Sequence, residues 1–303
     1  MEYTTLGRTG LKVSRLGLGG APLAGGFGQT DPGEVQRMIH EALDAGITFI
    51  DTAPLYGKGE SEKRIGEALV GRRDRVVLAT KAATSDRIYD YETVYQSVED
   101  SLRRLQTDWV DVLQLHDVET QSFDRVMNEA VPALDRLRRE GKVRHIGVST
   151  RKLSLLERYM HTGVFDTIQF YVRYMLIDHT AKDAVIPLAE RLNIGVINGS
   201  VLGMGLLADS PASFMQKDIV IQAQERMERI AFLRRTSNGG LIEPGMRFSL
   251  GHPGIAVTLT GAENSEVIRR NVQFCDGRGL APEEQEAVYK LFDREALFPD
   301  RPD

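Results

Sequence analysis

The sequence predicts an α/β fold, a closed (β/α)8 TIM barrel preceded by a β-hairpin and followed by extra helices at the C-terminus. Three observations lead to this prediction. Short apolar runs alternate with longer amphipathic segments, eight such runs occur along the chain, and they recur about every 30 residues. Alternation of this kind produces parallel strands joined by crossover helices, and eight units close into a barrel.

The N-terminal segment, residues 3–14, is predicted to form a short hairpin because Gly7 and Gly10 lie in its middle. We expect it to close the bottom of the barrel. The eight strands are predicted where the apolar runs are rich in leucine and β-branched residues. These runs are residues 16–19, 48–51, 76–80, 110–115, 145–149, 167–170, 195–198 and 256–260.

Helices are predicted between and after these strands, where apolar residues recur with helical period. Asp31 can cap the first helix, Pro32 suits its first position and Glu34 completes a capping box. Glycines follow several of the helices as C-terminal stops, at Gly46, Gly141 and Gly163. The predicted helices are residues 32–45, 60–69, 93–105, 123–140, 153–159, 180–192, 217–235 and 265–274.

Composition limits the classes of function. The 303 residues are 42% apolar and 27% charged, and without a linker they predict a single domain, 1–303. A net charge of −5 argues against binding to nucleic acid or an anionic membrane. Cys275 is the single cysteine, and the N-terminus lacks the pattern of a signal peptide, so we expect a reduced, cytoplasmic protein. No apolar run approaches the roughly 20 residues of a membrane span.

Four polar residues, Asp51, Tyr56, Lys81 and His116, lie at or just after the ends of the second, third and fourth predicted strands. The strand ends of such a barrel surround its active-site mouth. Taken singly, each has a structural use: Asp51 as a cap, Tyr56 as a rim aromatic, and Lys81 or His116 as a satisfied strand-end group. Their occurrence together at the strand ends favours a catalytic role over these structural uses.

Proton transfer is the chemistry that these residue types suit. A tyrosine hydroxyl, with a free pKa near about 10, is a poor acid or base at neutral pH, and a lysine ammonium beside Tyr56 lowers that pKa by favouring phenolate. Asp51 would hold Lys81 in place and keep it charged. A neutral His116 would donate a hydrogen bond to a carbonyl oxygen and orient it.

The chain resembles the aldo-keto reductase superfamily over nearly its whole length. The resemblance rests on Lys81 and on residues 16–22 (LGLGGAP), 49–57 (FIDTAPLYG), 59–66 (GESEKRIG), 109–117 (WVDVLQLHD), 141–149 (GKVRHIGVS) and 261–271 (GAENSEVIRRN). It implies a (β/α)8 barrel that binds a nicotinamide dinucleotide without a Rossmann fold. It also implies that Asp51, Tyr56, Lys81 and His116 are the catalytic tetrad, with Tyr56 as general acid or base and the cofactor as the source of hydride.

The resemblance further implies a set of cofactor contacts. Ser149 and Thr150 would bind the carboxamide, although many relatives have Ser-Asn there, and Tyr171, where many have Gln, is close by. Gly199 stands where many relatives stack an aromatic ring on the nicotinamide, so another residue, for which Tyr171 is a candidate, covers that face. The full implied set is Gly20, Asp51, Ser149, Thr150, Tyr171, Ser200, Leu202, Gly205, Gly261, Glu263, Asn264 and Asn271.

The glycines of residues 17–20 also suggest a dinucleotide fingerprint, but Pro22 occupies the place of its third glycine and the helix begins only at Pro32. We expect these glycines to let the backbone approach cofactor or substrate, and residues 25–28 to form a mobile loop at the mouth. The N-terminus of the last predicted helix, residues 265–274, can take a phosphate on its free N–H groups.

The choice between NAD and NADP depends on the residues that bind the adenosine end of the cofactor. NADP-preferring relatives place Lys or Arg near the 2′-phosphate, whereas this chain has Gly261, Glu263 and Val267 in that region. A carboxylate repels a phosphate and accepts from a free 2′-hydroxyl, so NAD is preferred over NADP. Arg269 or Arg270 swinging across would work against this preference.

Within the superfamily the chain is most similar to aldose dehydrogenases of the L-galactose, L-fucose and D-threo-aldose type. The similarity lies in residues 90–91, 116–119, 173–178 and 200–207. It implies NAD-linked oxidation of a sugar by a monomer or weak homo-oligomer. Reduction of small aldehydes or ketones is the alternative, and an NAD(H)-binding redox sensor with little turnover is the alternative from another class. No metal site is predicted, because the remaining histidines do not gather at strand ends.

Overall fold

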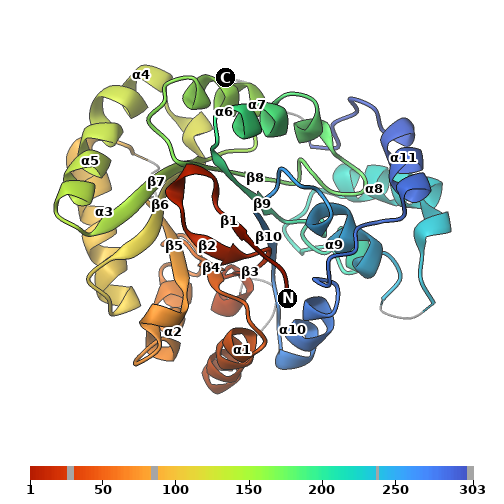
Figure 1. The fold of residues 1–303 in the computed structure, drawn as a ribbon, viewed down its shortest axis with the longest axis horizontal. Helices are drawn as coiled ribbons and strands as arrows, with labels where there is room; N and C mark the ends of the chain where they lie inside the picture. Colours follow the sequence, from red (N-terminus) through yellow and green to blue (C-terminus); the bar gives the residue numbers. More distant parts are fainter. Residues whose placement is uncertain (26–30, 83–87, 237–238, 299–303) are drawn as a thin grey trace.

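A closed barrel of eight parallel strands forms the centre of the protein, with helices around it (Figure 1). The computed structural model describes residues 1–25, 31–82, 88–236 and 239–298. Around the barrel the strands follow chain order from β3 to β9, and β10 closes the circle by pairing with both β9 and β3. The predicted (β/α)8 fold is therefore confirmed.

The predicted strands are all present, with bounds that agree to within one or two residues, the usual uncertainty of strand ends. They are β3 (Leu16–Gly19), β4 (Phe49–Asp51), β5 (Val77–Ala82), β6 (Val110–His116), β7 (Val143–Ser149), β8 (Thr167–Tyr171), β9 (Gly195–Gly199) and β10 (Val257–Thr260). The agreement arises because each strand is a run of apolar residues that the surrounding helices bury.

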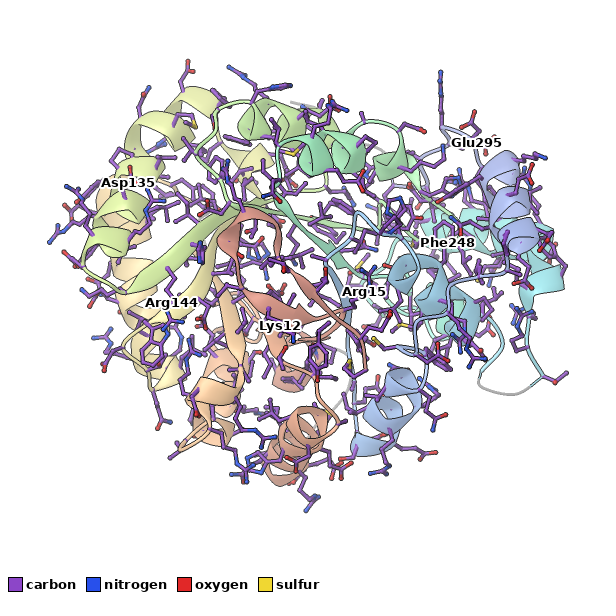
Figure 2. All side chains as sticks on the ribbon, in the orientation of Figure 1. Lys12, Arg15, Asp135, Arg144, Phe248 and Glu295 are labelled. Atoms are coloured by element: carbon purple, nitrogen blue, oxygen red, sulfur yellow. The ribbon has the colours of Figure 1, made fainter. Side chains whose placement is uncertain are left out.

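The N-terminal hairpin closes the bottom of the barrel, as expected. Its strands β1 (Tyr3–Thr5) and β2 (Lys12–Ser14) pair antiparallel. Leu6 between them is fully buried in one apolar cluster with barrel residues. Gly195 at the start of β9 makes room for it, since a Cβ there would lie 2.7 Å from Leu6 Cδ1. Figure 2 shows Lys12 and, just before β3, Arg15 on this face.

Helices cover the outside of the barrel, and Asp31 caps the first of them by accepting from the Glu34 N–H at 3.0 Å. They are α1 (Pro32–Asp44), α2 (Glu60–Ala68), α3 (Tyr91–Leu105), α4 (Phe123–Arg125), α5 (Val131–Arg139), α6 (Leu153–Met160), α7 (Val185–Arg191), α8 (Lys217–Arg229), α9 (Ile242–Leu250), α10 (Ser265–Val272) and α11 (Pro282–Leu291). Among the described residues, none of these helices has both the length and the apolar character to cross a membrane.

Some helices differ from the prediction. The helix expected over residues 123–140 is interrupted by a π turn, Val126–Ala130, because Pro132 has no N–H to continue the α-helical ladder. The helices expected over 180–192 and 217–235 are shorter, since short 3-10 turns take up one end of each. Helices α9 and α11 had no predicted bounds. Of the loop expected at residues 25–28, residues 26–28 lie outside the described part of the chain.

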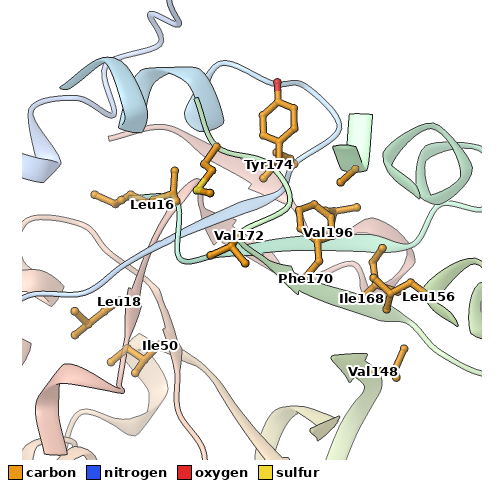
Figure 3. Close-up of a cluster of buried hydrophobic side chains, with 14 of the residues drawn as sticks. Leu16, Leu18, Ile50, Val148, Leu156, Ile168, Phe170, Val172, Tyr174 and Val196 are labelled. Atoms are coloured by element: carbon orange, nitrogen blue, oxygen red, sulfur yellow. The ribbon is translucent and has the colours of Figure 1, made fainter. Parts of the chain in front are cut away.

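Side chains alternate between the inside and the outside of the barrel. Outward residues pack beneath the helices, among them Leu16, Leu18 and Ile50, which Figure 3 shows in one cluster. Inward residues near the bottom form a second apolar cluster that the hairpin completes, with Phe49, Ala79, Val112, Ile197 and Val257 among its members.

Candidate active site

The inward positions change from apolar to polar toward the C-terminal ends of the strands. On β4 the inward Phe49 is followed two residues later by Asp51, and on β5 Ala79 is followed by Lys81. On β6 Gln114 pairs with Lys81 in the register, and His116 is the next inward residue toward the mouth. All these polar side chains are buried, so the alternation of the strands brings them together at the mouth end of the barrel.

Lys81 is the centre of the site. Its Nζ donates to Asp51 Oδ2 at 2.7 Å, to the Thr52 carbonyl at 3.0 Å and to the Tyr56 hydroxyl at 3.2 Å. An ammonium group has three N–H donors, and these three contacts use all of them. The ammonium is therefore held in one orientation with the tyrosine oxygen as one of its acceptors.

Tyr56 comes from the loop between β4 and α2. Its ring meets that of His116 edge to face, with centroids 5.9 Å apart and planes at 89°. The loop is tied down behind it, because the Ser61 hydroxyl bonds to Thr52 Oγ1 and donates to the Gly20 carbonyl, both at 2.8 Å. The phenol oxygen is thus placed beside Lys81, and its ring lies next to that of His116.

Burial is the largest influence on the charges of this cluster. It raises the pKa of the Asp51 carboxyl, and the Lys81 ammonium opposes that rise. For Lys81, burial is the largest influence and acts to lower the pKa, but the charges and hydrogen bonds of Asp51 and Tyr56 together outweigh it and the pKa is raised. The Lys81 ammonium and the Asp51 carboxylate therefore stabilise each other's charge against the effect of burial.

The pKa of Tyr56 corrects one expectation. The sequence predicted that Lys81 lowers it, and Lys81 does act in that direction. Burial of the phenol outweighs the ammonium, however, so that the pKa is raised above its ordinary value. Tyr56 is therefore a protonated phenol at neutral pH in the structure as it stands, which suits it to donate a proton.

Two glutamines were missed by the sequence analysis. Gln114 and Gln169 are buried one inward position below His116 and Tyr171. Gln114 Nε2 donates to Gln169 Oε1 at 2.6 Å and lies 3.4 Å from Asp51 Oδ1. The signal that could have identified them is their inward position, because a buried amide inside a barrel requires polar partners.

The residues expected around the nicotinamide lie at the ends of adjacent strands. Ser149 pairs with His116 in the β6–β7 register and with Gln169 in the β7–β8 register. Tyr171 pairs with Gly199, where a Cβ would lie 3.3 Å from the Tyr171 Cβ. Ser149, Tyr171 and Gly199 therefore surround one part of the mouth, next to His116.

Two acidic residues also accept hydrogen bonds from residues expected around the nicotinamide. Thr150 Oγ1 donates to Glu119 Oε2 at 2.5 Å, and the Tyr171 hydroxyl donates to Asp117 Oδ1 at 3.2 Å. Both carboxylates belong to the segment that follows β6. In the sequence, residues 116–119 marked a similarity to known enzymes, but no local pattern indicated that these carboxylates belong to the site.

The loop after β9 is compact. The Gly203 N–H donates to the Ser200 carbonyl at 2.8 Å, and Leu202 packs against Gly245 of α9. Gly205 has a φ of 95°, and a Cβ there would lie only 2.0 Å from the Ser210 carbonyl oxygen, so the turn requires glycine. Leu202 and Gly205 thus shape this loop from within.

The expected adenosine end lies where β10 meets α10. Gly261 is covered by Pro22, and the Asn271 amide donates to Thr260 Oγ1 at 2.8 Å. Asn264 is the N-cap of α10, and its Oδ1 accepts from the Val267 N–H at 3.1 Å. Glu263 is exposed beside it.

The N-terminus of α10 is not as open as the sequence suggested. Both the N–H and the hydroxyl of Ser265 donate to Glu34 Oε1, each at 3.2 Å. With the Val267 N–H held by Asn264, two of the N–H groups expected to be free are already bonded. The reason is a carboxylate contributed by α1, which favours the positive end of the helix dipole.

Comparison with known sequences places these features in context. The sequence model of the aldo/keto reductase family matches residues 15–291. L-Galactose dehydrogenase of Arabidopsis thaliana is 34% identical over 291 residues, which is 90% of this chain and 87% of the plant protein. D-threo-Aldose 1-dehydrogenase of a Pseudomonas species is 29% identical over 296 residues, with 88% of this chain and 90% of that protein covered.

Solved structures agree in fold. An aldo-keto reductase of Bacillus halodurans in its holo form superposes with a TM-score of 0.81 at 28% identity, covering 97% of each chain. A glycerol dehydrogenase of Gluconobacter oxydans superposes with a TM-score of 0.74 at 26% identity, covering 97% of this chain and 95% of the other. The likeness extends over the whole barrel.

Proposed function

Because the chain belongs to the aldo/keto reductase family, we propose that it is an oxidoreductase that moves hydride between a nicotinamide cofactor and a sugar, oxidising an aldose at its anomeric carbon. Proteins of this family use a nicotinamide cofactor. The observation that carries the proposal is the position of the Tyr56 phenol. It accepts a hydrogen bond from the Lys81 ammonium at 3.2 Å, and its ring centroid lies 5.9 Å from that of His116.

Tyr56 is the group that holds and moves the proton. When a carbonyl is reduced, its hydroxyl donates a proton to the carbonyl oxygen, and when an alcohol is oxidised, its phenolate accepts the alcohol proton. Lys81 stabilises the phenolate form, and Asp51 keeps Lys81 charged and in place. His116 borders the same space and orients the substrate oxygen. The cofactor, when bound, supplies or accepts the hydride.

A nicotinamide ring would lie in the part of the mouth next to His116. The Ser149 hydroxyl and the Gln169 amide there suit a carboxamide, which needs both donors and acceptors. Gly199 brings no side chain to this part of the mouth, and Tyr171 lies beside it, since a Cβ at Gly199 would be 3.3 Å from the Tyr171 Cβ. Asp51, Ser149, Thr150 and Tyr171 would accordingly hold this end of the cofactor.

We further propose that NAD is preferred over NADP. Glu263 is exposed near the start of α10 and Glu34 already occupies the Ser265 donors, so a 2′-phosphate in this region would meet negative charge. The two arginines of α10, Arg269 and Arg270, are both engaged elsewhere. Arg269 donates to Glu41 at 2.5 Å and Arg270 to Asn271 Oδ1 at 3.2 Å.

An aldose is favoured as substrate because two sequence relatives bear the names of sugar dehydrogenases. The test is NADH formation with L-galactose, L-fucose and L-rhamnose, each repeated with NADP. Rapid NAD-linked oxidation of at least one of them is expected. Turnover only in the reverse direction, with small aldehydes or ketones, would replace sugar oxidation by carbonyl reduction. Tight cofactor binding with negligible turnover in both directions would instead identify a redox-sensing module.

A further inference from the structure

A second carboxylate stands at the mouth of the barrel, immediately after the candidate catalytic histidine. Asp117 is buried, with 8% of its surface exposed. Its Oδ1 lies 3.9 Å from His116 Nε2 and accepts from the Tyr171 hydroxyl at 3.2 Å. Asp117 therefore lies between His116 and Tyr171 at the mouth of the barrel.

The charge of Asp117 reaches the reacting groups. The pKa of Tyr56 is raised chiefly by burial, and the Asp117 carboxylate contributes to that rise. The pKa of Tyr171 is raised by burial first and by Asp117 second. A carboxylate that acts on both phenols and lies beside the imidazole occupies a position that a bound substrate must approach.

The backbone at Asp117 supports a specific placement of this side chain. Its φ is 51°, in the left-handed region that aspartate tolerates better than most residues. A carboxylate can accept about four hydrogen bonds, so besides its existing partners, Tyr171 among them, it can accept from a ligand. A ligand hydroxyl that reaches it would form a charge-assisted hydrogen bond.

We propose that Asp117 determines substrate specificity by accepting a hydrogen bond from the hydroxyl group next to the reacting carbon, so that the site selects neutral hydroxylated substrates and rejects those with an anionic group at that position. This inference rests on the proposed function, since it assumes that the reacting oxygen lies between Tyr56 and His116. Because Oδ1 lies 3.9 Å from Nε2, a hydroxyl on the carbon next to the reacting carbon would come close to the carboxylate when the reacting oxygen bonds to His116.

Three small aldehydes isolate the group next to the carbonyl. Glycolaldehyde carries a hydroxymethyl group there, propanal carries an ethyl group of nearly the same size, and glyoxylate carries a carboxylate. A hydroxyl that bonds to Asp117 favours glycolaldehyde over propanal, because propanal cannot form this charge-assisted hydrogen bond. Like charge next to Asp117 disfavours glyoxylate. The two ratios of kcat/KM, each relative to propanal, measure these effects.

The experiment compares the wild-type chain with Asp117→Asn, which keeps the shape of the side chain and removes its charge. In the wild type, glycolaldehyde is expected to exceed propanal by about tenfold or more, with glyoxylate the poorest substrate. Asp117→Asn is expected to reduce the glycolaldehyde preference by about tenfold and to raise the glyoxylate ratio. Asp124→Asn, an exposed change of the same charge on α4, is expected to leave both ratios at wild-type values.

Ratios between substrates do not depend on how much of a variant is folded, and a thermal melt with a cofactor titration checks that Asp117→Asn retains the site. An active wild type whose two ratios are unchanged in Asp117→Asn would overturn the role of Asp117 alone. A wild type that reduces none of the three aldehydes and oxidises none of the sugars would overturn the proposed function, and the inference with it.

Discussion

The Lys81 ammonium lies 2.7 Å from the Asp51 carboxylate inside the barrel, and only 1% and 3% of these side chains are exposed. Burying an ion pair costs desolvation free energy that a pair at the surface does not lose. Two apolar side chains would fill the same space at lower cost. The pair thus indicates a requirement for charge at this place, which the contact between Lys81 and Tyr56 explains.

Separate effects on stability and activity are expected when this pair is changed. Lys81→Met leaves the Asp51 carboxylate buried without its cation, which should lower the free energy of unfolding by about 3–5 kcal/mol and abolish turnover. The double variant Lys81→Met/Asp51→Leu removes both charges, so it should recover most of that stability and remain inactive. Urea unfolding and steady-state kinetics measure the two effects. Recovery of turnover in the double variant would show that the charges are not needed.

Tyr56→Phe removes the phenol oxygen and keeps the ring. We expect turnover to fall about 10²–10⁴-fold, the usual contribution of general acid–base catalysis, with cofactor affinity nearly unchanged. Stopped-flow rates and a fluorescence titration with NADH test the two parts. The matched control is Tyr95→Phe on α3, whose hydroxyl donates to Glu140 on the outside of the barrel. Wild-type rates in the Tyr56 variant would exclude the phenol as the proton carrier.

The pH profile should differ between the two directions of reaction. Oxidation needs the Tyr56 phenolate, and because burial raises the pKa of this phenol, the rate should keep rising with pH beyond neutrality. Reduction needs the protonated phenol and should be level through the neutral range. Profiles of kcat/KM against pH in both directions provide the measurement. An oxidation rate that levels off below about pH 8 would mean that the phenol is more acidic than its burial implies.

Cofactor preference should respond to the charge near α10. Glu263→Arg places a cation where a 2′-phosphate would lie, so the ratio of the Kd for NADPH to that for NADH should fall by about tenfold. Fluorescence titrations with both reduced cofactors give this ratio without reliance on turnover. Glu283→Arg, an exposed change of equal charge on α11, is the control. A ratio unchanged from wild type would show that Glu263 does not determine the preference between the two cofactors.

Acid stability should depend on His179, which is buried beside Tyr289, with ring centroids 5.2 Å apart. Burial, with help from Lys182, lowers the pKa of His179 to about 4. The unfolded chain therefore binds a proton before the folded one does, and the free energy of unfolding should fall as pH drops from about 6.5 toward about 4.

His179→Phe should reduce this acid sensitivity, seen as a smaller loss of Tm between neutral pH and about pH 4.5. His161→Phe, at an exposed position, should keep the wild-type loss. His252 has a pKa lowered by burial to about 4 as well, so some acid sensitivity is expected to remain. An unchanged loss in His179→Phe would assign the whole effect to other groups.

The sequence by itself determined the strands and most helices, because each depends on the pattern of apolar residues within a few positions along the chain. It also placed Asp51, Lys81 and His116 at strand ends, and the parallel barrel then brings all strand ends to one mouth. The resemblance to known enzymes named the same residues. Where local patterns were insufficient, as at the π turn before Pro132, backbone hydrogen bonding decided the outcome.

Only the tertiary structure decided how the polar groups pair and what their charges are. The contact of Gln114 with Gln169, the hold of Glu34 on Ser265 and the approach of Asp117 to Tyr171 each join residues that are far apart in the chain. The pKa of Tyr56 is set by the difference between burial and the nearby ammonium. Loss of water and the distance between charges arise only when the barrel has closed, and no local pattern of residues contains either quantity.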